Sequence, residues 1–541
     1  MVDLAAEIRR RKTFAIISHP DAGKTTLTEK LLLYGGAIQL AGAVKAKRGK
    51  AGAVSDWMEM ERERGISITT SVMQFPYHGL QMNLLDTPGH ADFSEDTYRT
   101  LHAVDGAVML LDCAKGVEPQ TKKLFRVCKH RKMPIFTFVN KMDRPGREPF
   151  ELIGEVEEVL GIGVYPVTWP AYDGSHRFRG VYHRHTKKVH LFEASRATSS
   201  AAMGAEIAEA KMLELGDPKL KEELGDGYTR LKDEVDLLDQ AGDAFDEARF
   251  HSGDVSPMFF GSAINNFGLQ AFLDTFCEKM PPPLPRASTK GPIAPESDVF
   301  SAFVFKIQAN MNKAHRDRVA FMRVCSGRFD RGMKVKIVRT QKETRLANPT
   351  TFLAQERSIV EEGYAGDVLG VYDPGIFEIG DTVITPGTTD FAFEEIPSFA
   401  PEHFVRAAMM DPMRRKQLKT GLDQLAQEGT IQLYRPAEGL SGDVMLGAVG
   451  RLQLEVVKFR LKNEYDVDVR LEPMQVEFAR WISREDGKPL EPTELRAFDR
   501  ERVGIPAVDV KGRPVVLFAG EWQSNSAKRT FKGLRYTETF G

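Results

Sequence analysis

A nine-residue segment near the start of the chain has the residue types and spacing of a phosphate-binding loop. Its members are Ser18, His19, Pro20, Asp21, Ala22, Gly23, Lys24, Thr25 and Thr26. Apolar residues 14–17 precede it and helix-forming residues 27–33 follow it, so the loop is predicted to join a strand to a helix. Backbone N–H groups around Gly23 can then bind phosphate oxygens, while Lys24 reaches the terminal phosphates and the Thr25 hydroxyl binds Mg²⁺.

A carboxylate follows the next apolar strand, where a second phosphate-site element is expected. This element comprises Asp86, Thr87, Pro88, Gly89 and His90. Asp86 is placed to hold Mg²⁺ through a water molecule, and Gly89 can offer its backbone N–H to a terminal phosphate. The order of the two motifs along the chain supports a nucleoside triphosphate site.

Two further motifs indicate which base the site selects. Asn140, Lys141, Met142 and Asp143 follow the apolar strand 135–139, and Ser262 and Ala263 follow the apolar residues 258–260. The Asp143 carboxylate can accept hydrogen bonds from the N1–H and N2–H₂ groups of guanine, whereas adenine lacks that pair of donors. The Ala263 N–H can bind the guanine carbonyl oxygen. The sequence therefore predicts GTP and GDP as ligands rather than ATP.

Residues 61–70, between these motifs, resemble the segment of translational GTPases that senses the γ-phosphate. In that family the corresponding pattern is Arg-Gly-Ile-Thr, and its threonine binds Mg²⁺. Ser67 stands at the threonine position and keeps the ligand oxygen without the methyl group that restricts the side chain. The resemblance thus gives Thr25, Ser67 and, through water, Asp86 as metal ligands.

The motifs at 18–26, 64–72, 86–92, 140–144 and 261–274 together resemble the bacterial class II peptide chain release factors, over nearly the whole chain. This resemblance implies that His90 positions the attacking water and that Pro20 and Ile66 flank it as an apolar gate. It also implies a ribosome-stimulated GTPase that contacts the RNA of both ribosomal subunits and ejects class I release factors. Intrinsic hydrolysis is expected to be slow until the large subunit fixes His90.

The pattern along the 541 residues predicts three domains. Residues 1–285 are expected to form an α/β P-loop GTPase domain, doubly wound on a mainly parallel sheet, with a subdomain inserted at about 160–255. In that insertion, 180–182 and 188–191 are predicted to form a hairpin, and 204–215 and 218–238 to form helices. Short strands with glycine-bearing turns predict a β-barrel domain at 286–395.

Residues 396–541 are expected to form an α+β C-terminal domain, ferredoxin-like from 400 to about 480. Helices are predicted at 413–428 and 450–464, and the apolar residues of the second helix are interpreted as ordinary core. Beyond 480, residues 514–518 are predicted to be a strand and 522–536 a helix.

Composition limits the other function classes. The four cysteines lack metal-site or disulfide spacing, which suits a reducing cytoplasm. No apolar run reaches the roughly 20 residues needed to cross a bilayer, and no signal peptide is evident. The net charge of −2 indicates that contact with RNA would come from local basic segments. No long heptad pattern suggests self-association, so a cytoplasmic monomer without a membrane partner is expected.

Three alternatives share some of these motifs. A truncated elongation-factor-G-like translocase or a ribosome-rescue GTPase would have the same nucleotide site. A GTP-coupled metabolic protein, such as the regulatory subunit of a sulfate adenylyltransferase, also joins such motifs to a barrel. A GTP-binding scaffold without hydrolysis is disfavoured by His90 together with Thr25 and Ser67.

Overall fold

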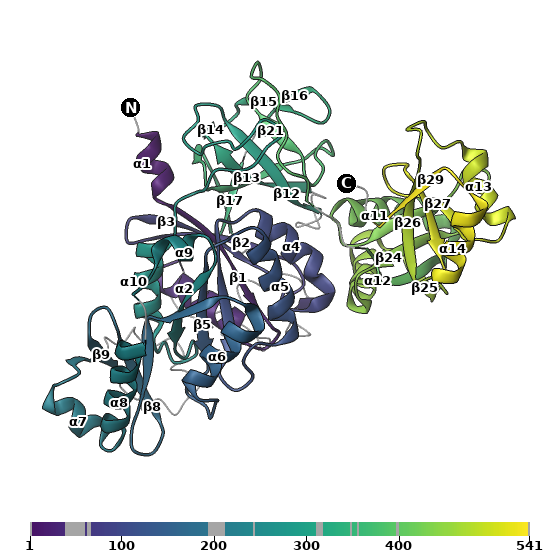
Figure 1. The fold of residues 1–541 in the computed structure, drawn as a ribbon. Coiled ribbons are helices and arrows are strands. Elements are labelled where there is room, and N and C mark those ends of the chain that lie inside the picture. The colour runs from purple at the N-terminus through teal and green to yellow at the C-terminus, as the bar shows by residue number, and fades with distance from the viewer. Residues whose placement is uncertain are drawn as a thin grey trace.

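The fold is described from a computed structural model (Figure 1). It describes residues 3–37, 60–61, 67–192, 211–241, 244–309, 318–346, 349–353, 356–396 and 400–538.

A seven-stranded sheet forms the centre of the N-terminal part, in the order β2-β3-β1-β4-β5-β11-β6. Its strands are β1 (Arg11–Ser18), β2 (Ser71–Tyr77), β3 (Leu80–Asp86), β4 (Gly106–Asp112), β5 (Ile135–Asn140), β6 (Gly163–Pro166) and β11 (Val255–Phe260). All pairings are parallel except that of β2 with β3. The sequence predicts five core strands, at 14–17, 82–85, 107–112, 135–139 and 258–260. They are confirmed as β1, β3, β4, β5 and β11, because each is a buried apolar run of strand length.

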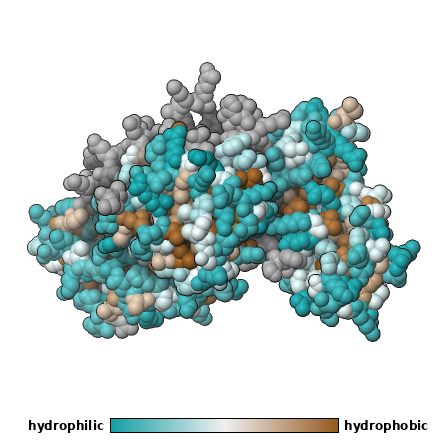
Figure 2. All heavy atoms as spheres, turned by 90° about the horizontal axis from the view of Figure 1, so that it is seen from above, coloured by the Kyte–Doolittle hydropathy of each residue, from teal (hydrophilic) through white to brown (hydrophobic). Residues whose placement is uncertain are grey.

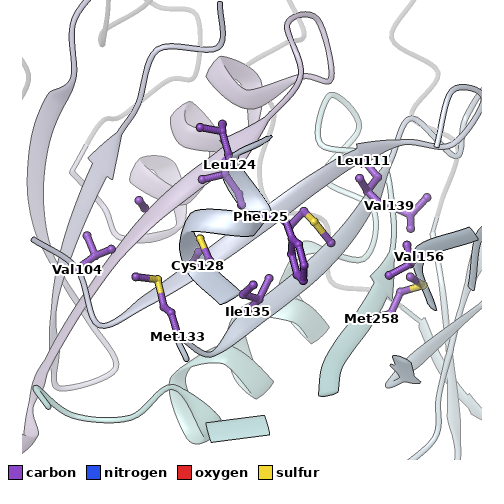
Figure 3. Close-up of a cluster of buried hydrophobic side chains, with 14 of the residues drawn as sticks. Val104, Leu111, Leu124, Phe125, Cys128, Met133, Ile135, Val139, Val156 and Met258 are labelled. Atoms are coloured by element: carbon purple, nitrogen blue, oxygen red, sulfur yellow. The ribbon is translucent and has the colours of Figure 1, made fainter. Parts of the chain in front are cut away.

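Helices cover both faces of this sheet, as predicted for a doubly wound fold. These helices are α2 (Lys24–Tyr34), α4 (Ser94–His102), α5 (Pro119–His130), α6 (Pro149–Leu160), α9 (Glu247–His251) and α10 (Leu269–Lys279), with a 3₁₀ turn η2 (Ala91–Phe93). The N-terminal helix α1 (Leu4–Arg9) instead packs through Ile8 against Tyr364 and Ala365. One core joins α4, α5 and α6 to the sheet, and another joins α2, α9 and α10. In the first, Leu124, Phe125 and Cys128 of α5 lie over Ile135 of β5 (Figure 3).

A four-stranded antiparallel sheet, in the order β10-β9-β8-β7, follows α6. It contains β7 (Thr168–Tyr172), β8 (Phe178–His183), β9 (Lys188–Leu191) and β10 (Lys211–Glu214), and α7 (Pro218–Leu224) and α8 (Gly227–Ala241) follow it in the chain. The predicted hairpin is confirmed as β8 and β9. β6 lies within the range given for the insertion but belongs to the central sheet, where it pairs with β11.

Two helix predictions in this region need correction. Residues 211–214 of the helix predicted at 204–215 form β10, which pairs with β9, while 204–210 lie outside the described residues. The helix predicted at 218–238 is two helices, because Gly225 between them has a φ of +56° that no helix contains.

Residues 301–384 form an eight-stranded sheet in the order β16-β15-β21-β12-β13-β20-β17-β18, together with the pair β14-β19. The strands are β12 (Ser301–Ala309), β13 (Arg318–Ser326), β14 (Arg328–Asp330), β15 (Lys334–Ile337), β16 (Lys342–Arg345), β17 (Thr350–Leu353), β18 (Glu356–Ile359), β19 (Glu362–Tyr364), β20 (Val368–Tyr372) and β21 (Thr382–Ile384). The barrel strands that the sequence predicts at 299–308, 319–325, 333–338, 368–372 and 382–384 are confirmed as β12, β13, β15, β20 and β21. Ion pairs join this unit to the central domain, among them Arg323 Nη2 to Asp105 Oδ2 at 2.5 Å and Arg11 Nε to Asp367 Oδ2 at 3.1 Å.

The C-terminal part contains the predicted ferredoxin-like unit, in the element order βαββαβ. Its elements are β22 (His403–Met409), η3 (Pro412–Arg414), α11 (Arg415–Gln427), β23 (Gln432–Pro436), β24 (Val444–Ala448), α12 (Arg451–Tyr465) and β25 (Val469–Pro473). The strand order is β25-β22-β24-β23, and α11 and α12 pack on this sheet.

A second βαββαβ unit follows, which the sequence reasoning missed. Its elements are β26 (Phe478–Arg484), α13 (Pro492–Arg500), β27 (Ile505–Val508), β28 (Pro514–Phe518), α14 (Glu521–Thr530) and β29 (Leu534–Thr537). β27 pairs with β23, so the two units share one eight-stranded sheet. The strand at 514–518 is confirmed, but the helix predicted at 522–536 ends at Thr530, because Gly533 has a φ of +80° and β29 then pairs with β26.

The outer surface is mainly hydrophilic when seen from above, with hydrophobic residues showing in smaller areas (Figure 2). Among the residues that the structure describes, no helix is long and apolar enough to span a bilayer.

Candidate nucleotide site

The phosphate-binding loop joins β1, which ends at Ser18, to α2, which begins at Lys24. Gly23 caps this helix with a φ of +100°, and a Cβ atom there would lie 2.4 Å from Asn140 Nδ2. Asn140 Nδ2 donates to the Ala22 carbonyl oxygen at 2.8 Å. The loop is therefore held against the strand end that carries the base motif, and only glycine fits at position 23.

Lys24 and Asp86, predicted for the phosphate and metal sites, meet in a buried ion pair. Lys24 Nζ lies 2.5 Å from Asp86 Oδ1, with side chains 7% and 1% exposed. Asp86 Oδ2 and Ser18 Oγ are buried without a hydrogen-bond partner among the described residues. Unsatisfied buried oxygens beside a lysine and a helix N-terminus fit a site for Mg²⁺ and phosphate.

The base motifs also come together. Asn140 Oδ1 accepts from the Ala263 N–H at 2.8 Å, and Ser262 Oγ donates to Asp143 Oδ1 at 2.5 Å. Met142 is buried, and its N–H donates to the Gly261 carbonyl at 3.1 Å. These contacts orient the Asp143 carboxylate and the Ala263 backbone at the carboxyl ends of β5 and β11.

Lys141 links the base motif to the phosphate loop. Its Nζ donates to the Asp21 carbonyl at 2.5 Å and to Asp112 Oδ2 at 2.8 Å. Burial raises the pKa of Asp112, but hydrogen bonds from Lys141 and the Ala114 N–H outweigh this and leave that pKa below its ordinary value. Lys141 and Asp21 both have a positive φ, of +68° and +66°, which shows how tightly both turns are constrained.

The remaining predicted residues of the two loops are placed as follows. Thr25 and Thr26 are half-buried at the start of α2, and His19 Nε2 lies 3.4 Å from Glu118 Oε1. Thr87 Oγ1 donates to the Ile16 carbonyl at 2.7 Å. The Pro88 carbonyl accepts from Thr97 Oγ1 at 3.2 Å, and a Cβ on Gly89 would lie 3.6 Å from Pro20 Cα.

His90 lies at the N-terminus of η2, with 39% of its side chain exposed. Its Nδ1 accepts from the Asp92 N–H at 3.2 Å and lies 3.2 Å from Asp92 Oδ1. The imidazole is thus attached by one ring nitrogen to its own loop. Ile66, predicted as the second gate residue, lies outside the described residues.

Residues 61–70, predicted to sense the γ-phosphate, are called the sensor segment below. Carboxylates hold the part of it that the structure describes. Glu61 Oε1 accepts from the Ile68 and Thr69 N–H groups at 2.9 and 3.1 Å, and Ser67 beside them is half-buried. Asp96 Oδ2 accepts from the Thr70 N–H at 2.8 Å and from Thr70 Oγ1 at 2.7 Å.

The barrel domain also reaches this segment, because Lys306 Nζ donates to the Thr70 carbonyl. Burial lowers the pKa of Lys306, and the pKa of Asp96 is lowered because Lys306, Arg99 and Thr70 outweigh the effect of its burial. The sequence reasoning missed Asp96 and Lys306. Neither belongs to a short sequence motif, and Lys306 lies 236 positions from Thr70, whose carbonyl it binds.

Comparison with known proteins gives three matching family models. Residues 9–282 match the elongation factor Tu GTP binding domain, residues 299–386 match elongation factor G domain 2, and residues 393–528 match the class II release factor RF3 C-terminal domain. The three models follow one another along the chain without overlap.

Curated relatives match over the full length. The chain is 53% identical to peptide chain release factor 3 of Symbiobacterium thermophilum, with 100% of this chain and 99% of the relative covered. It is 50% identical to the protein of that name from Gloeothece citriformis, with 99% and 97% covered. Among solved structures, a crystal structure of a Thermus thermophilus protein matches with a TM-score of 0.68 at 22% identity, covering 88% of this chain and 70% of that one. That last likeness concerns the fold alone.

Proposed function

The chain belongs to the peptide chain release factor 3 family, and from this premise we propose that it uses GTP to remove class I release factors from the ribosome. It is a translational GTPase that acts in termination, binds guanine nucleotides and works on the ribosome. The full-length identity to release factor 3 carries this conclusion. The elongation-factor-G-like translocase and the rescue GTPase are not favoured, because residues 393–528 match the release factor C-terminal domain.

For the nucleotide, we assign the base contacts to Asp143 and Ala263. The hydrogen bonds from Ser262 to Asp143 and from Ala263 to Asn140 support this, because they orient an acceptor and a donor at one site. Guanine presents the complementary donor pair and carbonyl oxygen. Binding of adenine would leave the Asp143 carboxylate without its donors.

For the phosphates, we assign binding to residues 18–26 and to Gly89. When GTP binds, Lys24 exchanges part of its contact with Asp86 for the terminal phosphate oxygens, and the backbone N–H groups beside Gly23 bind the others. Mg²⁺ would be held by Thr25, Ser67 and, through water, Asp86, and it would supply neutralisation of phosphate charge. The two unsatisfied oxygens of Ser18 and Asp86 support this placement.

For hydrolysis, we assign to His90 the orientation of the attacking water in line with the terminal phosphate. Pro20 lies beside Gly89, which supports its role as one side of an apolar gate, and Ile66 is proposed as the other side. Because a partly exposed imidazole is easily misdirected by solvent, turnover stays slow until ribosomal RNA fixes His90.

For the mechanical step, the sensor segment transmits the state of the nucleotide to the barrel. Lys306 of the barrel binds the Thr70 carbonyl directly, so a change in the segment on GTP binding alters a contact between domains. The proposed domains are residues 1–285, 286–395 and 396–541, and the insertion at about 160–255 lies within the first of them. A cytoplasmic monomer remains part of the proposal.

The test uses ribosomes that carry a bound class I release factor. GTP with the protein should release that factor, whereas ATP should not, and the release should be followed by labelling the factor. The variant His90→Ala should bind GDP as the wild type does but lose ribosome-stimulated hydrolysis. Wild-type turnover by this variant would contradict the role of His90, and no GTP-dependent release would contradict the function.

A further inference from the structure

The contact between η2 and α12 joins the loop that carries His90 to the C-terminal domain. Asp92 Oδ2 accepts from the Leu452 N–H at 2.7 Å, across 360 positions of sequence. Leu452 is the second residue of α12, whose first-turn N–H groups have no partner within the helix. Asp92 therefore caps a helix of another domain, where a carboxylate is favoured by the helix dipole.

The same aspartate contacts His90 through two groups. Its backbone N–H donates to His90 Nδ1 at 3.2 Å, and its Oδ1 lies 3.2 Å from that nitrogen. Both contacts are made to Nδ1, so together they set the direction in which the ring points. One residue thus fixes the proposed catalytic histidine and the docked helix.

The approach of the two elements is close enough to require a glycine. A Cβ atom on Gly450, the residue that caps α12, would lie 2.0 Å from Asp92 Cγ. Gly450 has a φ of −142° and a ψ of 161°, an extended conformation open to any residue. The reason for glycine at this position is therefore the space that Asp92 occupies.

An apolar seam surrounds this polar contact. Met60, Ile68, Phe93 and Val456 are buried together, and Leu452 and Phe459 pack against them. Ile68 belongs to the sensor segment and Phe93 to η2, so α12 touches both parts of the nucleotide domain that surround the proposed γ-phosphate site. The Asp92 contact is itself partly buried at the edge of this seam, with 19% of the Asp92 side chain exposed.

From these contacts we infer that Asp92 is a positioning residue, through which docking of α12 fixes the His90 imidazole for hydrolysis. The inference rests on the proposed role of His90. When α12 is docked, the Leu452 N–H holds the Asp92 carboxylate and the η2 turn, and these hold the ring by Nδ1. When α12 is displaced, Asp92 loses its partner and the ring loses its fixed direction.

The experiment uses two variants. Gly450→Ala, in the C-terminal domain, displaces the Asp92 side chain by its added methyl group, and Asp92→Ala removes the carboxylate itself. The first readout is the ¹⁵N chemical shifts of the His90 ring in the GDP-bound protein without ribosomes, assigned by their loss in His90→Gln. Both variants should shift these signals. Gly442→Ala is the matched control, because its Cβ would meet only Pro436 Cγ at 3.5 Å, an ordinary contact.

The second readout is ribosome-stimulated hydrolysis. Both variants should lose about tenfold or more in kcat, because small misplacements of a positioned group have effects of this size. The KM for ribosomes and the affinity for GDP should stay at wild-type values. Asp92→Asn keeps an oxygen that can accept from Leu452, so it should restore the ring signals and most of kcat.

Several results would overturn the inference. They are wild-type ring signals in both Gly450→Ala and Asp92→Ala, a loss of kcat without a change in the ring signals, or an effect confined to the KM for ribosomes. If Gly450→Ala does not fold, the comparison of Asp92→Ala with Asp92→Asn still tests whether the Asp92 side chain positions the His90 ring. Full turnover by His90→Ala would instead contradict the proposed role of His90 in hydrolysis, and the ring signals, read without ribosomes, would still test the coupling.

Discussion

Asp143 is held for its proposed base contact before any nucleotide arrives, because Ser262 Oγ donates to one of its carboxylate oxygens. The other lone pairs stay available for two donors on one edge of a purine. A preset acceptor of this kind selects a base by what it leaves unpaired when the wrong base binds.

Asp143→Asn should therefore reverse the preference of the site. The amide NH₂ would face the guanine N2–H₂ donor, which we expect to lower GTP affinity by about 100-fold from the loss of charged hydrogen bonds. Xanthosine triphosphate, which has a carbonyl oxygen at that position, should bind better than GTP. Competition of both nucleotides against a fluorescent GDP measures this. Asp239→Asn, on the exposed face of α8, serves as the control, and unchanged GTP affinity would refute the assignment.

Lys24 and Asp86 form a pair that is more costly to break than to replace. Lys24→Met leaves the buried Asp86 carboxylate without its cation, which should destabilise the nucleotide-free protein by about 3 kcal/mol. Adding Asp86→Asn should recover part of that loss, since it removes the unpaired charge. Thermal unfolding of the two single variants and the double variant checks this. Equal and additive losses would show that the pair is not coupled.

At the scale of elements, local patterns in the sequence predicted most of the nucleotide domain. The strands at β1, β3, β4, β5 and β11 are buried apolar runs that end in polar motif residues, so both type and position could be inferred. Ile66 stays a prediction. The base and phosphate motifs could be predicted because the residues of each lie within a short stretch of sequence, whereas Asp92, Asp96 and Lys306 make contacts between distant segments.

The wrong or missing predictions of secondary structure also concern elements that contacts between distant segments define. β10 has no apolar alternation and is a strand because it pairs with β9. The second βαββαβ unit is not predicted because pairings between strands distant in sequence, such as β26 with β29 and β27 with β23, define it. In α12, Val456 and Val457 are both buried, as the apolar pattern predicts, but Val457 faces its own sheet while Val456 faces the nucleotide domain, which that pattern alone does not distinguish.

His102, at the end of α4, makes the stability of the protein depend on pH. Burial and the nearby Arg131 and Arg286 lower its pKa to about 3, and its Nε2 is buried without a partner among the described residues. The unfolded chain binds a proton near the ordinary pKa of about 6.5 while the folded chain does not, so stability falls as pH drops from there toward 3.

We expect His102→Gln to lessen this acid sensitivity. At pH 5 the wild type should have lost about 2 kcal/mol through His102 alone, relative to pH 7.5. Unfolding temperatures of wild type and variant at both pH values give the comparison, in which the wild type should drop further. An equal fall in the unfolding temperature of the two proteins between these pH values would show that His102 does not cause the acid sensitivity.

At the scale of the molecule, apolar and polar contacts attach both the barrel and the C-terminal domain to the nucleotide domain, and barrel residues such as Phe303 and Val319 share an apolar core with it. Ion pairs such as Arg323 to Asp105 hold the barrel. The C-terminal domain is held by the apolar seam around Val456 and by Arg99, whose guanidinium donates to the Glu428 and Gly429 carbonyls at 3.1 and 2.9 Å. The seam contacts Ile68 and Phe93, and Lys306 of the barrel contacts Thr70, so each of the two domains touches the segment at 61–70.

Val456 and Val457 are neighbours on α12 that separate docking from folding. Val456, 1% exposed, lies in the seam, and Val457, fully buried, lies in the core of its own domain. Val456→Asp should undock the C-terminal domain, because the seam cannot keep a carboxylate away from water, while the domain itself stays folded. Val457→Asp should instead unfold the C-terminal domain, because a carboxylate buried in its core lowers the free energy of unfolding by several kcal/mol.

Two measurements distinguish these outcomes. Small-angle scattering of the GDP-bound protein should give a larger radius of gyration for Val456→Asp, while circular dichroism retains the wild-type secondary structure. Val457→Asp should lose helix and strand signal. Because the two substitutions insert the same group one residue apart, a compact Val456→Asp protein would mean that the seam does not hold the domains together, and a shared loss of secondary structure would mean that docking and folding of this domain are one event.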